Sequence, residues 1–158
     1  MQSEKTPLQF KRMTKDDIPE LTEIMTRTFD DDAQTFLGEE SGGPPGYNTG
    51  EFLRKYAFEE GGLGWTIFAD DKKVGAFIIF ITPENDHWLG NIFIDPNYQN
   101  HQIGTRTWDF IEKTYPNARN WYLETPTWAT RNHHFYEKLG FVRIKAQGDD
   151  TLYKKEMS

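Results

Sequence analysis

The chain has 158 residues, and 25 acidic against 18 basic side chains give it a formal net charge of −7. A chain of this length can bury about 70% of its unfolded surface in one core, so we expect a single domain over residues 1–158. It has no cysteine, which excludes disulfides, thiolate metal sites and a cysteine nucleophile. The acidic balance argues against nucleic acid as the main partner, because phosphate backbones bind clustered lysine and arginine.

The chain has no segment with the length and composition of a membrane helix. The longest strongly apolar run is Ala76–Ile81, whereas a membrane span needs about 18 or more apolar residues. The first residues, MQSEKTPLQF, lack the basic flank and apolar stretch of a secretory signal. We therefore expect a cytoplasmic protein that has no membrane partner.

The first third of the chain predicts one strand and two helices. Leu8–Met13 alternates as a strand does, and Thr14 then begins a variant of the capping box. Apolar residues at helical spacing predict a first helix that runs to about Phe29. Asp30–Asn48 is acidic and then rich in glycine and proline, which predicts a long loop. A second helix starts near Glu51.

The rest of the chain predicts six strands and two more helices. The charged turn Asp70–Lys72 joins the first two of these strands into a hairpin, and Gly140 ends the last helix. The predicted strands are Trp65–Ala69, Lys73–Thr82, Trp88–Asp95, Trp121–Thr125, Phe141–Ala146 and Thr151–Glu156, and the predicted helices are Gly104–Tyr115 and Thr130–Leu139.

The resulting order, β-α-α-β-β-β-α-β-α-β-β, predicts an α+β fold. A mixed, mostly antiparallel sheet of about seven strands would pack against four helices. The strand–helix–strand segment at 88–125 implies a right-handed parallel crossover. Hairpins on either side of it make the remaining pairs antiparallel.

The most informative stretch is Ile92–Thr105, IFIDPNYQNHQIGT. In it a strand ends, a polar turn follows, and a helix opens near Gly104. Backbone N–H groups and a helix N-terminus that converge in this way suit a phosphate. Taken alone, the pattern favours an ordinary connection between a strand and a helix, because one glycine and one glutamine are weak evidence.

Two motifs resemble the signatures of the GNAT superfamily of N-acetyltransferases. Asp95–Thr105 is similar to the acetyl-CoA signature, Gln/Arg-x-x-Gly-x-Gly/Ala after a strand that ends in proline, and Gln99 and Gly104 stand at matching positions. Asn132–Phe141, NHHFYEKLGF, resembles the second signature and is the more specific match. The predicted order of elements also resembles the α/β/α fold of that superfamily over nearly the whole chain.

This resemblance implies a site for acetyl-CoA, a cosubstrate, and no metal. The diphosphate would lie on the amides of Gln99–Thr105, and the pantetheine would add to the strand edge at Ile92–Ile94. The strands at 88–95 and 121–125 must then separate. The implied contacts are Ile92, Phe93, Ile94, Gln99, Asn100, His101, Gln102, Ile103, Gly104, Thr105, Asn132 and Phe135.

The chain departs from the family pattern at two positions. Gln102 stands where the signature usually has its first glycine, and Gly90 stands near the position where many relatives carry a carboxylate base. Of the nearby basic residues, His101 would add positive charge near the phosphates, whereas Arg106 fits a solvated surface better.

The resemblance implies catalytic roles for two side chains. Tyr136 matches the general acid, and a phenol whose pKa is about 10 can protonate a thiolate. Glu124 is our favoured base, because aromatic neighbours on its strand could desolvate it and raise its pKa. Asp30–Asp32 and a chain of waters are alternatives. A backbone amide near Phe93 would stabilise the oxyanion.

The same resemblance leaves the acceptor open. Asp30–Asp32 with Glu39 and Glu40 concentrate negative charge, which favours a cationic primary amine, although a solvated acidic loop explains them equally well. Adjacent His133 and His134 point about 100° apart on a helix, so we expect no metal site there. Pairing of the C-terminal strands would make a homodimer.

We thus expect an N-acetyltransferase that acts on a small-molecule or peptide amine by direct transfer within a ternary complex. The alternatives are a sensor that binds acyl-CoA without turnover and a carbohydrate-binding module. Serine-hydrolase chemistry is disfavoured because Ser3, Ser41 and Ser158 do not stand in a nucleophile motif. Nucleotide hydrolysis is disfavoured because the sequence lacks GxxxxGK[ST].

Overall fold

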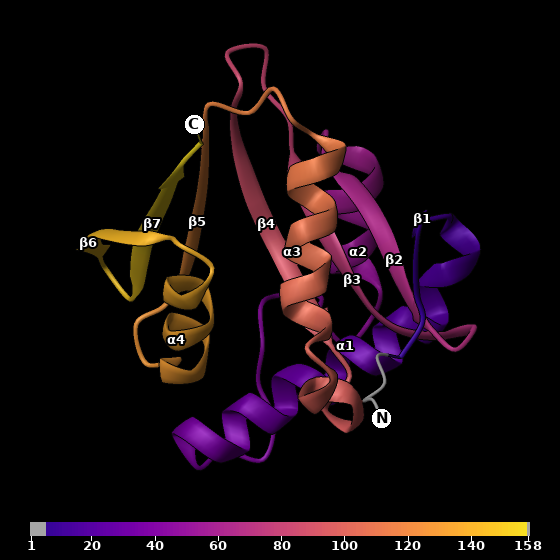
Figure 1. The fold of residues 1–158 in the computed structure, drawn as a ribbon. Helices are drawn as coiled ribbons and strands as arrows, with labels where there is room; N and C mark the ends of the chain where they lie inside the picture. Colours follow the sequence, from indigo (N-terminus) through magenta and orange to yellow (C-terminus); the bar gives the residue numbers. More distant parts are fainter. Residues whose placement is uncertain (1–5, 158) are drawn as a thin grey trace.

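The computed structural model describes residues 6–157, except for the side chains of residues 99–101. Seven strands form one sheet in the order β1-β2-β3-β4-β5-β7-β6 (Figure 1). The strands are β1 (Leu8–Arg12), β2 (Leu63–Ala69), β3 (Lys72–Phe80), β4 (Asp86–Ile94), β5 (Asn120–Pro126), β6 (Val142–Gln147) and β7 (Asp150–Glu156), and the helices are α1 (Ile18–Asp32), α2 (Glu51–Arg54), α3 (Ile103–Thr114) and α4 (Thr130–Lys138).

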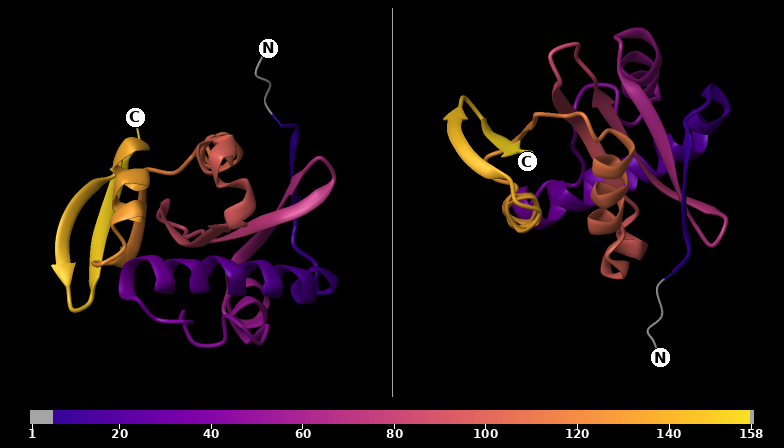
Figure 2. Two further views of the ribbon diagram at one scale, coloured as in Figure 1. Left: turned by 90° about the horizontal axis from the view of Figure 1, so that it is seen from below. Right: turned by 45° about the horizontal axis from the view of Figure 1, so that its top comes forward.

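The fold class predicted from the sequence is confirmed. Only β4 and β5 pair in parallel, and the other described pairs are antiparallel. Helices α1 and α2 cover one face of the sheet and α3 covers the other (Figure 2). None of the helices in the described part of the chain is both long enough and apolar enough to cross a membrane.

The central strand β3 is buried on both faces, as its unbroken apolar run predicts. Ala76 and Ile78 pack with α1 and α2, whereas Phe77 and Ile79 pack with α3. The two faces therefore hold two separate hydrophobic cores, and β3 contributes side chains to both. Its neighbour β4 pairs with this buried strand.

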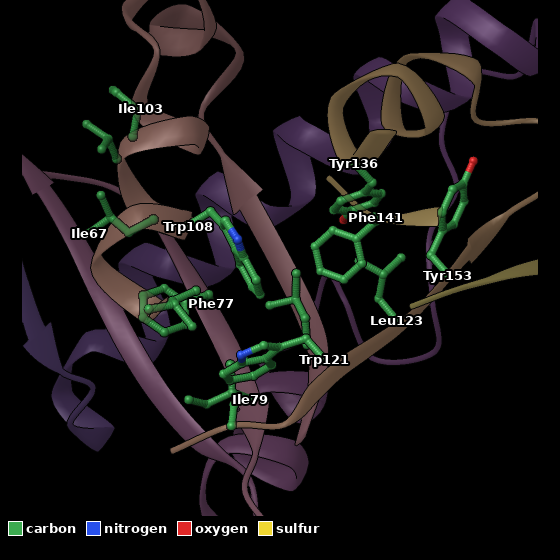
Figure 3. Packing of buried hydrophobic residues seen from close by; sticks show 14 of the residues in the cluster. Ile67, Phe77, Ile79, Ile103, Trp108, Trp121, Leu123, Tyr136, Phe141 and Tyr153 are labelled. Carbon is green, nitrogen blue, oxygen red and sulfur yellow. The ribbon is translucent and has the colours of Figure 1, made fainter. Parts of the chain in front are cut away.

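The core on the α3 face is largely aromatic (Figure 3). The Trp108 ring lies edge-on to Trp121 and to Phe141, with centroid distances of 5.3 and 5.1 Å. Tyr136 of α4 joins the same core next to Phe141 and Tyr153 (Figure 3). Edge-to-face packing of this kind fixes ring orientation, so the position of Tyr136 is set by the core.

The first helix is longer than the sequence predicts. It continues past Phe29 to Asp32, and a π-turn at Ala33–Leu37 follows before Gly38 ends it at φ +66°. The predicted loop therefore starts about eight residues later than expected. The expectation was wrong because Ala33 is buried and extends the apolar face of the helix. As a result, the acidic residues at 30–32 are held on a helix.

Candidate active site

Strands β4 and β5 are paired only where they begin. The parallel ladder joins Asp86–Trp88 to Asn120–Tyr122. The rings of Trp88 and Tyr122 stack across it at a centroid distance of 5.2 Å. Beyond this point the strands separate (Figure 1), and β4 from Gly90 to Phe93 has no ladder partner in β5. This is the separation that the family resemblance implies.

A cavity of about 380 Å³ lies where the strands separate. Helix α1, the separated part of β4, the start of α3 and helix α4 form its walls. The lining residues are Thr28, Phe29, Asp32, Ile92, Phe93, Ile94, Gln102, Gly104, Thr105, Arg131, Asn132, Phe135, Tyr136 and Lys138. Most of the residues that the sequence motifs single out are thus brought to one place.

Four of the predicted cofactor contacts are not among the described residues that line the cavity. The Ile103 side chain is fully buried in the core on the α3 face, so a ligand could reach only its main chain. Gln99, Asn100 and His101 belong to the 3-10 turn before α3, but their side chains lie outside the described residues. Their predicted contacts stay predictions.

The turn between β4 and α3 is anchored to α1. Asp95 is buried, and its carboxylate accepts a hydrogen bond from the Asn97 amide at 3.0 Å. Arg27 of α1 donates to the same carboxylate at 2.6 Å. No sequence pattern predicts the pairing with Arg27, although Asp before Pro is a familiar turn signal. The pair anchors the start of the 3-10 turn at Pro96–His101, which leads into α3. The first N–H groups of α3 have no partner within the helix.

Two residues shape the start of α3. Gln102 adopts a left-handed conformation at φ +56°, which is uncommon for a residue other than glycine. A Cβ added at Gly104 would lie 2.8 Å from Cζ of Phe135. The glycine therefore allows α3 to pack against the Phe135 ring in the cavity wall.

Tyr136 and Asp32 are the two titratable groups with shifted pKa values at the cavity. Burial raises the pKa of Tyr136 above its ordinary value, and the negative charge of Asp32 raises it further. Burial also raises the pKa of Asp32, opposed by the Arg131 guanidinium and reinforced by Asp31. Arg131 lies 3.8 Å from the Asp32 carboxylate. Tyr136 therefore keeps its proton at neutral pH, and Asp32 is a more basic carboxylate than usual.

Glu124 lies apart from this group. It is exposed on β5, where it accepts a hydrogen bond from Gln147 at 3.0 Å, and it is not among the cavity-lining residues. Its neighbour Tyr122 stacks on Trp88, and Glu124 itself is not desolvated by the aromatic cover that we expected. Its predicted role as a base stays a prediction.

Gly90 has a packing reason to be a glycine. A Cβ at this position would lie 2.5 Å from the Phe80 ring. A carboxylate at the usual family position would therefore collide with Phe80. Among the described residues that line the cavity, Asp32 is the one carboxylate. From the sequence it was an alternative to Glu124.

Helix α4 is tied to β5 and β7 by polar side chains. Asn132 lines the cavity and donates to the Thr125 hydroxyl at 3.2 Å. The two ring nitrogens of His133 lie 2.7 Å from the Tyr153 hydroxyl and 3.1 Å from the Pro126 carbonyl oxygen. His133 thus has a structural role. Within the described part of the chain, no cluster of three or more His, Asp or Glu residues is arranged to hold a metal ion.

Comparisons with known proteins agree with this geometry. Residues 18–141 match the model of the acetyltransferase (GNAT) family. No curated protein sequence matches the chain.

Solved structures share the fold at low sequence identity. The chain is similar to PaiA N-acetyltransferase from Thermoplasma acidophilum in complex with coenzyme A, with a TM-score of 0.76, 19% identity, and 96% of this chain and 99% of that chain covered. An acetyltransferase from Thermus thermophilus has a TM-score of 0.79 and 17% identity, with 98% of this chain and 100% of that chain covered. The ribosomal-protein-S18-alanine N-acetyltransferase from Escherichia coli has a TM-score of 0.73 and 16% identity, with 96% of this chain and 95% of that chain covered. Because the family model matches most of the length of this chain, the chain belongs to the GNAT acetyltransferase family.

Proposed function

We propose that this protein transfers an acetyl group from acetyl-CoA to a primary amine, directly and within a ternary complex. One observation carries the proposal. The unpaired edge of β4, the start of α3 and the buried hydroxyl-bearing ring of Tyr136 border the same cavity. This arrangement combines an edge for an extended chain, donors for a phosphate and a proton donor.

The residues present fit the acetyl-CoA molecule. A pantetheine arm can add to the unpaired edge of β4 at Ile92–Ile94 as a peptide adds to a sheet edge. The N–H groups at the start of α3 can receive a diphosphate. Asn132 lines the same cavity, where its amide donates to the Thr125 hydroxyl, and it would hydrogen-bond the arm. The relative from Thermoplasma acidophilum, a protein of the same fold, was solved with coenzyme A, which supports this part of the proposal.

Acetyl-CoA supplies a thioester, whose carbonyl carbon is the electrophile. The amine nitrogen forms a bond to that carbon, the carbon–sulfur bond breaks, and the sulfur leaves with the electron pair of that bond. The amine must lose a proton and the thiolate gains one. Tyr136 is suited to give the second proton because its raised pKa keeps it protonated. A main-chain amide near Phe93 would stabilise the oxyanion.

Asp32 is suited to accept the proton of the amine. It borders the same cavity as Tyr136, and burial raises its pKa. Its negative charge also attracts a cationic acceptor. Glu124 stays a second candidate for the base, acting on an acceptor that reaches the exposed face of β5. Asp32 is better supported, because Glu124 does not line the cavity.

A thiol-release screen with acetyl-CoA against a panel of primary amines tests the activity. We expect release above the background without amine for at least one acceptor, with an acetylated amine detected by mass spectrometry. Coenzyme A affinity, measured by calorimetry on the same protein, separates the alternatives. Tight binding of coenzyme A with no acetylated product would support the non-catalytic sensor.

The proposal also covers the domain organisation, the cellular location and the oligomeric state of the enzyme. We propose that residues 1–158 act as one domain, that the protein works in the cytoplasm, and that two copies pair through their C-terminal strands. Val142 and Ile144 on the edge strand β6 are 63% and 48% exposed, and a second copy could cover them. Light scattering on purified protein tests the pairing.

A further inference from the structure

Arg131 joins α4 to α1, two helices that form walls of the cavity. Its Nη1 atom lies 3.5 Å from the Asp31 carboxylate and 3.8 Å from the Asp32 carboxylate. The guanidinium also lies over the Phe36 ring, 5.2 Å from its centroid. That ring is 6.1 Å from the ring of Trp128, which stands just before α4. Charged and aromatic contacts therefore hold the end of α1 against the start of α4.

The place of Arg131 within α4 is unfavourable for a cation. It is the second residue of the helix, which begins at Thr130. A helix N-terminus carries a partial positive charge, so a positive side chain in the first turn is repelled. The carboxylates of Asp31 and Asp32 supply negative charge that compensates for this. The ion pairs with α1 therefore offset a cost within α4.

The two ion pairs differ in burial. The side chains of Arg131 and Asp31 are 44% and 39% exposed, and pairs at such exposure contribute little to stability. The Asp32 side chain is only 17% exposed. Its burial raises the pKa of the carboxyl group, and the positive charge of Arg131 opposes that rise. The contact therefore affects the charge of Asp32 more than the stability of the fold.

The other charged or titratable groups near Asp32 do not take the place of Arg131. Asp31, on the same helix, raises the pKa of Asp32 further. Tyr136, on α4, keeps its proton at neutral pH and carries no charge. Lys138 also lines the cavity, but the cation that opposes the desolvation of Asp32 is Arg131. The described side chains of β4 and α3 that line the cavity are uncharged.

We propose that Arg131 is a positioning residue for the acetyl transfer, whose guanidinium holds the Asp32 carboxylate at the cavity wall as an ion that can accept the proton of the amine. This inference rests on the proposed acetyltransferase activity and on Asp32 as its base. The proton passes from the amine nitrogen to a carboxylate oxygen of Asp32, and Arg131 keeps all of its own protons. The arginine thus sets the pH above which the base is ready.

The test is the pH dependence of the rate with the best acceptor from the thiol-release screen. The ionisation of that amine is the same for every variant, so a difference between variants reports on the protein. In Arg131→Gln the acidic limb should move to higher pH, because the charge that opposes the desolvation of Asp32 is gone. A move of about one pH unit lowers the rate on the limb about tenfold, and the loss should disappear above the limb. Arg131→Lys keeps the charge and should largely restore the limb.

Two further variants show whether Arg131 acts through Asp32. Once Asp32→Asn has removed the limb, adding Arg131→Gln should not change the pH profile further. A further loss in this double variant overturns the inference, because Arg131 would then act on the substrate itself. Arg143→Gln is the matched control. It removes a guanidinium that lies 3.7 Å from the Glu137 carboxylate and is not among the described residues that line the cavity, so the limb should stay in place.

A measurement without turnover separates this inference from the proposed function. The titration of the Asp32 carboxyl carbon, followed by NMR in the free protein and assigned with Asp32→Asn, should move to higher pH in Arg131→Gln and stay in place in Arg143→Gln. That result without acetylation of any amine would support the hold of Arg131 on Asp32 and contradict the proposed function. Acetylation with an acidic limb that does not move in Arg131→Gln, or that moves equally in Arg143→Gln, overturns the inference and leaves the proposed function standing.

Discussion

The two ends of the β4–β5 pair differ in whether the backbone N–H and C=O groups of β4 are paired with β5. At the closed end, Asp86–Trp88 is hydrogen-bonded to Asn120–Tyr122, and the stacked rings cover the ladder. At the open end, β4 runs beside a cavity that the start of α3 also reaches. The same strand is therefore structural along one half and available to a ligand along the other. The site arises where sheet pairing stops.

The largest effect that would sharpen this comparison is expected at Tyr136. Tyr136→Phe removes the hydroxyl and keeps the ring in the aromatic core. We expect the acetylation rate to fall by about 10²- to 10⁴-fold, the usual contribution of a general acid. Coenzyme A affinity, measured by calorimetry, should stay nearly unchanged. Equal rates in the two proteins would remove Tyr136 from the mechanism.

Asp32→Asn tests the proton acceptor on the opposite wall. The base works in its ionised form, so the rate should rise with pH through the raised pKa of Asp32. We expect the variant to lose this acidic limb and to react about 10- to 100-fold more slowly at neutral pH. The measurement is a pH–rate profile.

Two matched variants complete that test. Asp31→Asn changes the neighbouring carboxylate, which also pairs with Arg131. It should keep the limb and move it to lower pH, because the charge of Asp31 no longer raises the pKa of Asp32. Glu124→Gln tests the alternative base. A limb that persists in Asp32→Asn and disappears in Glu124→Gln would assign the role to Glu124. The raised pKa of Asp32 means that folding favours its protonated form over the ion. The contribution of Asp32 to the free energy of unfolding is therefore lost as the pH rises through that pKa. At pH 7 we expect Asp32→Asn to be no less stable than the unchanged protein.

Gly104→Ala tests the packing at the open end. The new Cβ would lie within 3 Å of the Phe135 ring and displace it or α3. We expect coenzyme A affinity to fall about tenfold, which is about 1.4 kcal/mol. Gly42→Ala is the control, since its added Cβ finds only ordinary contacts. Unchanged affinity in Gly104→Ala would show that this contact does not shape the cofactor site.

Trp88→Ala tests the closed end. We expect the free energy of unfolding, measured in urea, to fall by about 1 kcal/mol because the stacked pair with Tyr122 is lost. Coenzyme A affinity should not change. A double-mutant cycle with Tyr122→Ala isolates the pair from the loss of buried area. A weakened cofactor site in Trp88→Ala would mean that the two ends are coupled.

Gln102→Gly should have the smallest effect. Gln102 adopts a positive φ, and glycine does so without steric cost. Its greater freedom in the unfolded chain offsets part of this gain, so we expect a stabilisation of less than about 1 kcal/mol in urea unfolding. Gln102→Ala keeps the Cβ and should show no gain. If both variants destabilise the protein equally, the Gln102 side chain itself supports the turn.

The sequence predicted most of the fold because its signals are local. The apolar run of β3 predicted a central strand, and Gly140, at φ +103°, ends α4 as expected. The family motifs predicted that Ile92–Ile94, Asn132 and Tyr136 meet at one cavity, which they do. The end of α1 was misplaced because the burial of Ala33 depends on contacts made elsewhere in the fold.

Tertiary packing alone decided which carboxylate reaches the cavity. Sequence position favoured Glu124, yet in the folded chain Glu124 is exposed and does not line the cavity. The extension of α1 brings Asp32 to the cavity, where burial raises its pKa. The sequence by itself determined the order of elements and the motif residues, because periodicity and turn chemistry act between neighbours in the chain. Desolvation and charge coupling at Asp32 and Tyr136 act between residues about a hundred positions apart, so only the folded chain decides them.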